Sequence, residues 1–248
     1  MKNLFLFLFL LVVFTSKAQD NRVSGLNSRQ FTKYWKVESE SPDYKVTFQG
    51  DTAEIVSPKG LTLWRKEKMS GKVTIEYDAC VVVESDGDRL SDLNCFWMAS
   101  DPQYPDNLWK REKWRSGIFL NCYSLQLYYL GYGGNHNSTT RFRRYDGDES
   151  GITNPKARPA ILKEYTDAGH LLKPNHWYHI KITNENNRVS YYIDGERLVD
   201  FRDAEPLREG WFGFRTTLSR TRITNFSYEC SSQEATAVPL QWLSLIHI

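Results

Sequence analysis

The residues best suited to chemistry lie between positions 128 and 145, where polar and aromatic side chains are densest. If residues 141–145 are extended, Arg141, Arg143 and Tyr145 share one face, because side chains alternate along a strand. Two guanidinium groups on one face suit a carboxylate, since each can donate two parallel hydrogen bonds to it. A uronic acid offers such a carboxylate. The alternative is that these arginines pair with the acids at positions 146, 148 and 149.

The same segment carries glycines and amides. Glycines at positions 131, 133 and 134 permit a sharp turn or a close approach of the backbone to a ligand. We expect Tyr128, Asn135 and Asn137 to contact sugar rings and hydroxyl groups. His136 is an imidazole in polar company within the same segment.

A second cluster surrounds the apolar run at positions 96–98. Asp92 and Asn94 are two residues apart, so on a strand they share a face. Trp97 can offer an aromatic platform to the C–H face of a sugar while nearby polar side chains bind its hydroxyls. The alternative role for Trp97 is in the hydrophobic core.

A third cluster, Glu164, Asp167 and His170, is expected on a loop before a strand at 177. A carboxylate and an imidazole three positions apart can form a general base and the group that orients it. The same residue types also suit a capped turn, so this cluster predicts either catalysis or local structure.

Short strands must position these clusters. Polar and apolar residues alternate over residues 72–79 and again over 177–183, and this period of two predicts strands with one exposed face. Asp194 and Gly195 separate apolar runs at 188–193 and 196–199, which predicts a two-residue hairpin. Two more strands are expected at 210–215 and 223–228, and no amphipathic helix of 12 residues or more is evident. The pattern favours an all-β antiparallel sandwich or barrel.

Several segments, in order, resemble the concanavalin A-like lectin and glucanase superfamily: residues 60–64, 73–77, 175–180, 192–196 and 210–214. More narrowly, residues 91–101, 128–137 and 139–145 resemble a secreted bacterial sandwich domain of unassigned function, similar to others in polysaccharide-utilisation systems. Residues 238–242 resemble the start of exo-rhamnogalacturonan-lyase-type modules. The resemblance implies a two-sheet antiparallel jelly-roll sandwich over residues 19–230.

It also implies action on an acidic plant cell-wall polysaccharide of rhamnogalacturonan or pectin type. β-Elimination requires groups that neutralise the uronate, remove the proton beside its carboxyl group and protonate the leaving oxygen. The candidates are Arg141 and Arg143 for the carboxylate, His136 or His170 for the base, and Tyr132 or Tyr145 for the acid. Hydrolysis needs two carboxylates instead, with Asp92 and Glu164 as the first candidates.

Other signatures are missing. The glucanase signature Glu-x-Asp-x-x-Glu begins at Glu76 and Asp78 but is broken by Val81, and phosphate-loop, serine-hydrolase and zinc-protease motifs are lacking. No cofactor is indicated, and calcium has no support from a sequence motif. A non-catalytic carbohydrate-binding module, attached to a catalytic module farther along the chain, is therefore the alternative to an enzyme.

The chain ends bear on location. Residues 1–18 combine a basic start with an apolar run of about 11 residues, typical of a cleaved secretory signal and too short to span a bilayer. We therefore expect a secreted or periplasmic protein without a membrane insertion. Residues 231–242 are expected to form a linker and the start of another module, and residues 243–248 resemble a translated sequencing adapter.

Charge and cysteines add two expectations. Without its signal the chain would hold 30 basic and 30 acidic residues, which argues against nucleic acid as a partner and leaves a polysaccharide or oligosaccharide. The four cysteines, at 80, 95, 122 and 230, could form up to two disulfides in an oxidising compartment or remain as small buried residues.

Overall fold

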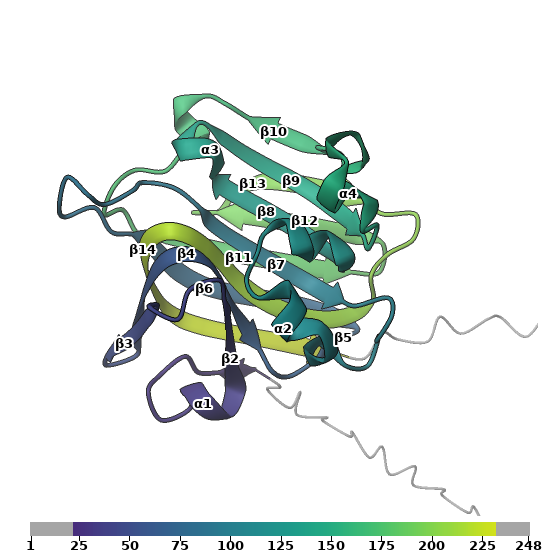
Figure 1. Cartoon of the computed structure of the whole chain (residues 1–248), viewed down its shortest axis with the longest axis horizontal. Helices are drawn as coiled ribbons and strands as arrows, with labels where there is room; N and C mark the ends of the chain where they lie inside the picture. Colours follow the sequence, from purple (N-terminus) through teal and green to yellow (C-terminus); the bar gives the residue numbers. More distant parts are fainter. Residues whose placement is uncertain (1–21, 232–248) are drawn as a thin grey trace, which may run out of the picture.

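The computed structural model describes residues 22–231, and strands dominate that range (Figure 1). The strand pairs are antiparallel. The predicted signal, the predicted module start up to residue 242 and the suspected adapter sequence lie outside the described residues. Among residues 22–231, no helix is long and apolar enough to cross a membrane.

The strands of the amino-terminal half are β1 (Val23–Ser24), β2 (Trp35–Ser39), β3 (Lys45–Gln49), β4 (Thr52–Arg65), β5 (Met69–Ser70), β6 (Lys72–Val81) and β7 (Leu93–Ser100). Those that follow are β8 (Gln126–Gly133), β9 (Thr139–Asp146), β10 (Lys163–Tyr165), β11 (Tyr178–Glu185), β12 (Arg188–Ile193), β13 (Glu196–Arg202) and β14 (Glu209–Ser231). Short helical segments connect them: α1 (Phe31–Tyr34), η1 (Leu108–Arg111), α2 (Glu112–Arg115), η2 (Leu120–Ser124), α3 (Gly134–Asn137), α4 (Ser150–Thr153), η3 (Pro155–Ala157) and η4 (Ala168–His170).

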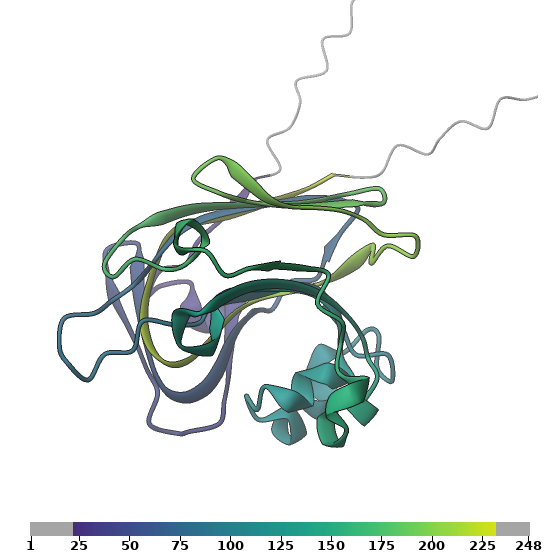
Figure 2. The same ribbon diagram turned by 90° about the horizontal axis from the view of Figure 1, so that it is seen from above.

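The strands form two layers that pack face to face (Figure 2). One layer contains β10, β9, β8, β7 and the first part of β14, and the other contains the last part of β14 with β6, β11, β12 and β13. A large apolar cluster fills the space between them. The predicted all-β, two-sheet antiparallel jelly-roll sandwich is confirmed.

The hairpin predicted from Asp194 and Gly195 is also present, between β12 and β13. Both turn residues have a left-handed backbone, with φ values of 51° and 84°. A two-residue turn of this kind matches the twist of the flanking strands.

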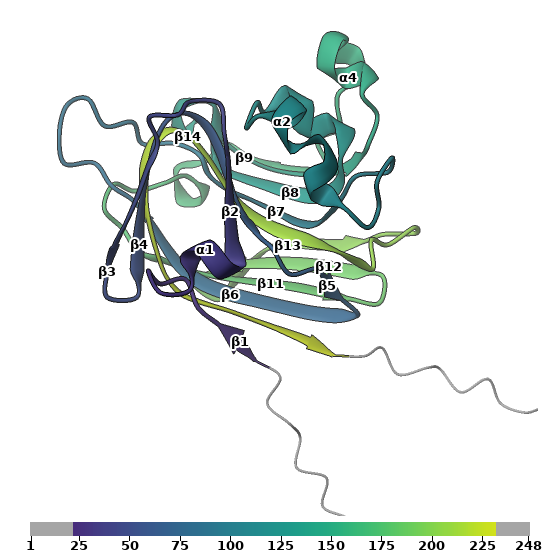
Figure 3. The ribbon, with the colours of Figure 1, turned by 60° about the horizontal axis from the view of Figure 1, so that its bottom comes forward.

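β14 differs from the prediction of two separate strands. It is one strand of 23 residues that passes from one layer into the other (Figure 3). Its pairing shifts between Thr217 and Ser219 and between Thr224 and Ser227, and Leu218 and Asn225 have positive φ values of 49° and 54°. Such bulges bend a strand without ending it, and an alternation pattern alone does not separate this case from two strands.

The layer containing β7 is buried on both faces over part of its area. Trp97 and Tyr128 point into the core between the layers, whereas Phe96 and Tyr129 belong to a second apolar cluster. Residues of η1 and η2 complete the second cluster, so these segments cover the outer face of the layer. We call the segment from η1 through α2 to η2, residues 108–124, the helical cover. Burial of both faces explains why positions 96–98 form a continuous apolar run.

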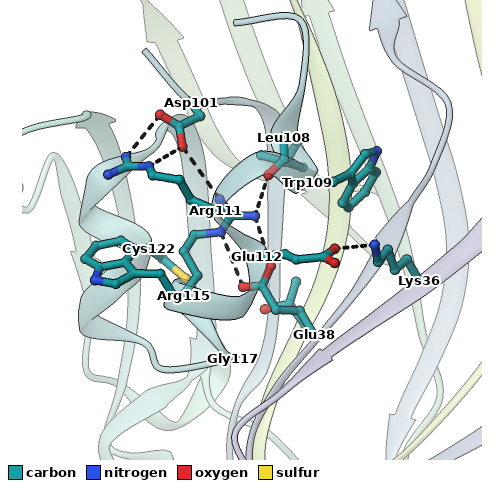
Figure 4. Close-up of polar contacts among 12 residues, drawn as sticks. Lys36, Glu38, Asp101, Leu108, Trp109, Arg111, Glu112, Arg115, Gly117 and Cys122 are labelled. Carbon is teal, nitrogen blue, oxygen red and sulfur yellow. Dashed lines mark hydrogen bonds and ion pairs between the residues drawn. The ribbon is translucent and has the colours of Figure 1, made fainter. Parts of the chain in front are cut away.

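A buried ion pair ties this helical cover to the sheet (Figure 4). Arg115 of α2 is fully buried and donates from Nη2 to Glu38 of β2 at 3.0 Å and to the Leu108 carbonyl at 2.7 Å. Burial raises the pKa of Glu38, and the charge of Arg115 opposes that rise. The pair joins segments that are 77 residues apart in the sequence.

A second arginine extends the same network. Arg111 donates from Nε to Asp101 at 2.7 Å and from Nη1 to Glu149 at 2.5 Å. Asp101 is completely buried and also lies 3.7 Å from Nη1 of Arg115. The network therefore connects β2, η1, α2 and the start of α4.

The four cysteines, at positions 80, 95, 122 and 230, are free. Burial raises the pKa of the Cys122 thiol to about 11 and that of Cys95 to about 12, so these two remain protonated at neutral pH. The structure corresponds to the prediction of small buried residues, because three of the four are buried and the fourth is half-buried.

Candidate functional site

The part of the outer face that the helical segments leave uncovered contains a cavity of about 440 Å³. Five arginines line it: Arg89, Arg141, Arg143, Arg158 and Arg215. We call it the arginine cavity. The lining carboxylates are two, Glu40 and Asp92, so arginines outnumber acids. Phe119, Leu120 and Tyr123, in and beside η2, form its wall on the side of the helical cover.

The strand register determines which residues form the floor of the cavity. Residues paired directly across β14, β7, β8, β9 and β10 are Arg215, Asn94, Gly131, Arg141 and Glu164, in that order. Residues paired in this way carry neighbouring side chains on one face of a sheet. The next row on the same face contains Phe96, Tyr129 and Arg143, so Arg143 lies toward the helical cover.

Gly131, at the centre of the first row, leaves room for the side chain of Tyr129. A Cβ atom at this position would lie 2.2 Å from the Tyr129 hydroxyl, because the Tyr129 side chain crosses over the glycine. The close approach expected at these glycines is present at Gly131 and Gly133, but the approaching groups are the side chains of Tyr129 and Leu172.

Asn94 lines the cavity and carries a hydrogen-bond acceptor without a partner. Its Nδ2 donates to Asp92 Oδ1 at 3.2 Å, and its buried Oδ1 has no partner in the structure. Asp92 in turn accepts from Arg89 at 2.8 Å and from Ser91 at 2.9 Å. Asn94 is 6% exposed and lines the cavity, so a residue with an unsatisfied buried oxygen borders this open space.

Four of the cavity arginines have partners inside the protein, and one of them, Arg143, donates to the Pro159 carbonyl. Arg89 binds Asp92, and Arg141 donates from Nε to Glu164 at 2.5 Å. Arg215 is 3% exposed and donates to the Gly117 carbonyl at 2.6 Å, which fixes the turn between α2 and η2. The ion-pair alternative therefore holds for Arg141, although its partner is Glu164 and not one of the acids after the strand.

The structure brings six of the predicted site residues to the arginine cavity: Asp92, Asn94, Asn135, His136, Arg141 and Arg143. Asn135 and His136 are exposed and have left-handed φ values of 51° and 58° in the turn between β8 and β9. Glu164 lies beside the cavity as the partner of Arg141.

Burial contradicts the site roles predicted for three residues. Trp97, Tyr128 and Tyr145 are each 0% exposed, so none of them can contact a polysaccharide. Trp97 and Tyr128 face the core between the layers, and Tyr145 lies in the cluster under the helical cover. The Tyr128 hydroxyl is instead used to donate to Asp203 at 2.6 Å. The alternation pattern correctly placed Arg141, Arg143 and Tyr145 on one face of β9. It did not show that the helical cover buries this face at Tyr145.

The other predicted site residues, Asn137, Tyr132 and His170, lie outside the lining of the arginine cavity. Asn137 clamps the backbone of Leu172 with two hydrogen bonds, at 2.8 and 2.9 Å. Tyr132 is 2% exposed, donates to the Leu171 carbonyl at 3.3 Å, and borders a separate hollow of about 140 Å³ together with His170. The bases and acids proposed for β-elimination are therefore separated: His136 lines the arginine cavity, His170 and Tyr132 border the second hollow, and Tyr145 lies under the helical cover.

His170 is held between two carboxylates in that second hollow. Its Nδ1 lies 2.8 Å from Asp167 and its Nε2 lies 3.3 Å from Glu196, while its ring stacks on Tyr165 with centroids 4.1 Å apart. Partial burial lowers the pKa of His170, but the hydrogen bonds to Asp167 and Glu196 outweigh this and raise it above the ordinary 6.5. The pairing favours a charged imidazolium that links η4 to β13.

We predict that Glu196→Gln lowers the pKa of His170, measured by NMR titration of the ring protons. The pKa of His170 is raised in the folded state. The stabilisation from its contacts with Asp167 and Glu196 is therefore present below the ordinary pKa of histidine and is lost as the pH rises through the folded-state pKa. Glu185→Gln, at the far end of β11, is the control and should leave the titration unchanged. An unchanged pKa in Glu196→Gln would contradict the prediction.

Sequence reasoning missed Arg89, Arg158 and Arg215 of the cavity. Arg215 is the last residue of the strand predicted at 210–215, so alternation could have placed its side chain on the face opposite to that of Phe214, but its position beside Asn94 depends on strand register. Arg158 is in the segment after η3, and nothing local indicates that it reaches the cavity.

Within residues 22–231, no group of three or more His, Cys, Asp or Glu side chains could hold a metal ion.

The family model described as "Domain of unknown function (DUF6250)" matches residues 55–226, more than half of the chain. The chain belongs to this family. The match spans β4 to β14 and therefore includes every strand of the cavity floor. No curated protein matches this DUF6250 member significantly.

Solved structures share the fold of this DUF6250 domain. A Bacillus subtilis protein of unknown function with a galectin-like fold is 16% identical, with a TM-score of 0.66, covering 86% of this chain and 96% of its own. Carbohydrate binding module CBM66 from Bacillus subtilis is also 16% identical, with a TM-score of 0.52 and coverage of 79% and 94%. The VIP36 exoplasmic/lumenal domain, in its Ca²⁺/Man2-bound form, is 10% identical, with a TM-score of 0.57 and coverage of 86% and 87%. These similarities establish a lectin-like β-sandwich.

Proposed function

We propose that this DUF6250 domain binds carbohydrate in the arginine cavity. The observation that carries the proposal is an open, arginine-rich hollow with an unpartnered buried amide oxygen, built on the strands of a lectin-like sandwich. Ligand pockets typically have volumes of about 300–1,000 Å³ and a few fixed polar groups, which fits this cavity. Two proteins with this fold, CBM66 and VIP36, are described as carbohydrate-binding or as sugar-bound, and this supports the choice of ligand.

The ligand class that we propose is an acidic polysaccharide, with the pectin and rhamnogalacturonan type as the first candidate. Five lining arginines against two lining carboxylates favour an anionic chain over a neutral one. Membership of the concanavalin A-like superfamily, a link to rhamnogalacturonan-lyase-type modules and secretion remain part of this proposal and derive from the sequence.

Binding without cleavage is the form of the proposal that the geometry supports best. The two tyrosines considered as proton donors are buried, and His170 lies in the second hollow. Glu164, considered for hydrolysis, is paired with Arg141. β-Elimination keeps one supporting observation, since the exposed His136 borders the same cavity as the arginines.

The test uses affinity gels containing homogalacturonan, rhamnogalacturonan, or a neutral galactan or mannan. We expect retarded migration in the acidic gels, and no new ultraviolet absorbance or reducing ends after incubation with these polymers. New absorbance from unsaturated ends would establish the lyase alternative. Absence of binding to every glycan would reject the proposal.

A matched pair of variants locates the site. Thr217 lines the cavity and is half-exposed, so Thr217→Tyr fills the hollow without truncating the core. We expect it to weaken binding by at least about tenfold, equivalent to about 1.4 kcal/mol. Thr47→Tyr, on an exposed position of β3, should bind like the unmodified protein. Equal affinities for the two variants would place the site elsewhere.

A further inference from the structure

The cavity arginines differ in whether they are free to bind an anion. Arg89 and Arg141 are each neutralised by a carboxylate, and Arg215 is buried against a backbone carbonyl. By contrast, Arg143 has no carboxylate partner and donates only to the Pro159 carbonyl, and the Arg158 side chain has no hydrogen bond or ion pair within residues 22–231. Three cavity arginines therefore have no carboxylate partner, and because Arg215 is buried, Arg143 and Arg158 are the two best placed to bind an anion.

Arg143 and Arg158 are held near each other. Arg143 binds the carbonyl of Pro159, the residue that follows Arg158. Gly151 of α4 packs against the same segment, since a Cβ on it would lie 3.2 Å from the Arg158 Cα. The Arg158 side chain remains exposed, so it can reorient toward a ligand.

Tyr123, which lines the cavity, is affected by the charges of both Arg143 and Arg158. Burial raises the pKa of Tyr123, and the charges of Arg158 and Arg143 oppose this rise. Both guanidinium groups are therefore close enough to Tyr123 to act on the same hydroxyl group.

We infer that Arg143 and Arg158 together bind the free carboxylate of a uronic acid residue. The inference rests on the proposed function and deepens it, because it names the charged group recognised and adds Arg158 as a binding residue. Arginine suits this task because its planar fork matches a carboxylate through two parallel hydrogen bonds.

A chemical consequence follows for the ligand. A methyl ester adds one methyl group to the uronate, removes its negative charge and leaves a single carbonyl oxygen in place of two equivalent carboxylate oxygens. Hydrogen bonds to a charged group are stronger than those to a neutral one, so the unesterified sugar should bind more tightly. Arg141 already shares its charge with Glu164.

The test measures calorimetric affinities of the whole protein for three probes: tri-galacturonic acid, its fully methyl-esterified form, and neutral galactotriose. Arg158→Gln is the main variant, because this exposed side chain has no internal partner to lose, and Arg143→Gln is the second. Arg29→Gln, an exposed arginine before α1, is the matched control. Thermal unfolding of each variant confirms that the fold is kept.

We expect the unmodified protein and Arg29→Gln to prefer the acid over its ester by about tenfold or more, as expected for charge-assisted hydrogen bonds. Arg158→Gln should lose about tenfold in affinity for the acid, with little change for the ester and the neutral trisaccharide. In the Arg143→Gln/Arg158→Gln double variant, the preference for the acid should disappear.

Other results would overturn the inference. Equal binding of acid and ester by the unmodified protein, or an Arg158→Gln loss that is the same for all three probes, rejects carboxylate recognition but leaves carbohydrate binding intact. Absence of binding to acid, ester and neutral sugar alike rejects the proposed function itself. The two failures are therefore distinguishable.

Discussion

Replacing Arg115 with alanine should lower the free energy of unfolding by about 3–5 kcal/mol, the range observed when one partner of a buried ion pair is removed. The Arg115 side chain is fully buried, and its loss leaves the carboxylate of Glu38, itself 6% exposed, without its counter-ion. The carbonyl of Leu108 loses a donor in the same step. Urea unfolding followed by tryptophan fluorescence measures the effect.

Two controls separate this charge effect from loss of packing. Arg188→Ala removes an exposed arginine of β12 that pairs with Asp200 of the neighbouring strand β13. This change should lower the free energy of unfolding by less than about 1 kcal/mol. The double variant Glu38→Leu/Arg115→Met replaces both charges with apolar side chains and should regain most of the stability lost in Arg115→Ala. A loss below about 1 kcal/mol in Arg115→Ala would contradict the role assigned to this pair.

The pH dependence provides an independent check on Arg115→Ala. Burial raises the pKa of Glu38, and without the opposing charge of Arg115 it should rise further. The folded state then binds a proton more readily than the unfolded state, so the stability of the variant increases as the pH falls. We therefore expect a smaller stability loss at mildly acidic pH than at neutral pH, and a pH-independent loss would argue against Glu38 as the source.

Replacing Trp97 with alanine should also lower the free energy of unfolding by about 3–5 kcal/mol, as for other large aromatic residues truncated in a core. The Trp97 ring is 0% exposed and packs among Tyr128, Phe142 and Tyr191, with ring centroids 5.7 to 6.1 Å apart. Its removal leaves a cavity between the layers that the surrounding strands can fill only partly.

The matched control is Trp177→Ala, because Trp177 is 42% exposed and should cost less than about 1 kcal/mol. The comparison also decides between the two roles considered for Trp97. A core residue loses stability, whereas a sugar platform would lose glycan binding with an unchanged unfolding midpoint. The second outcome would contradict the burial described here.

Much of the sandwich follows from the sequence because alternation is a local property of extended chain. It identified residues 72–79 and 177–183 as strands, now β6 and β11, and Asp194 with Gly195 as a tight hairpin turn. The continuity of β14 could not be predicted, because its bulges depend on partners in both layers. Alternation also placed Arg141 and Arg143 on one face, and both line the arginine cavity.

The sequence by itself therefore determined the strand periodicity, the hairpin turn and which side chains share a face of β9. Only the tertiary structure decided that Arg141 is neutralised by Glu164, that Arg158 reaches the cavity, and that the end of the face holding Tyr145 lies under the helical cover. The physical reason is range. Side-chain direction along a strand is set by neighbouring backbone angles, whereas register, coverage and ion pairing depend on contacts between residues far apart in the chain.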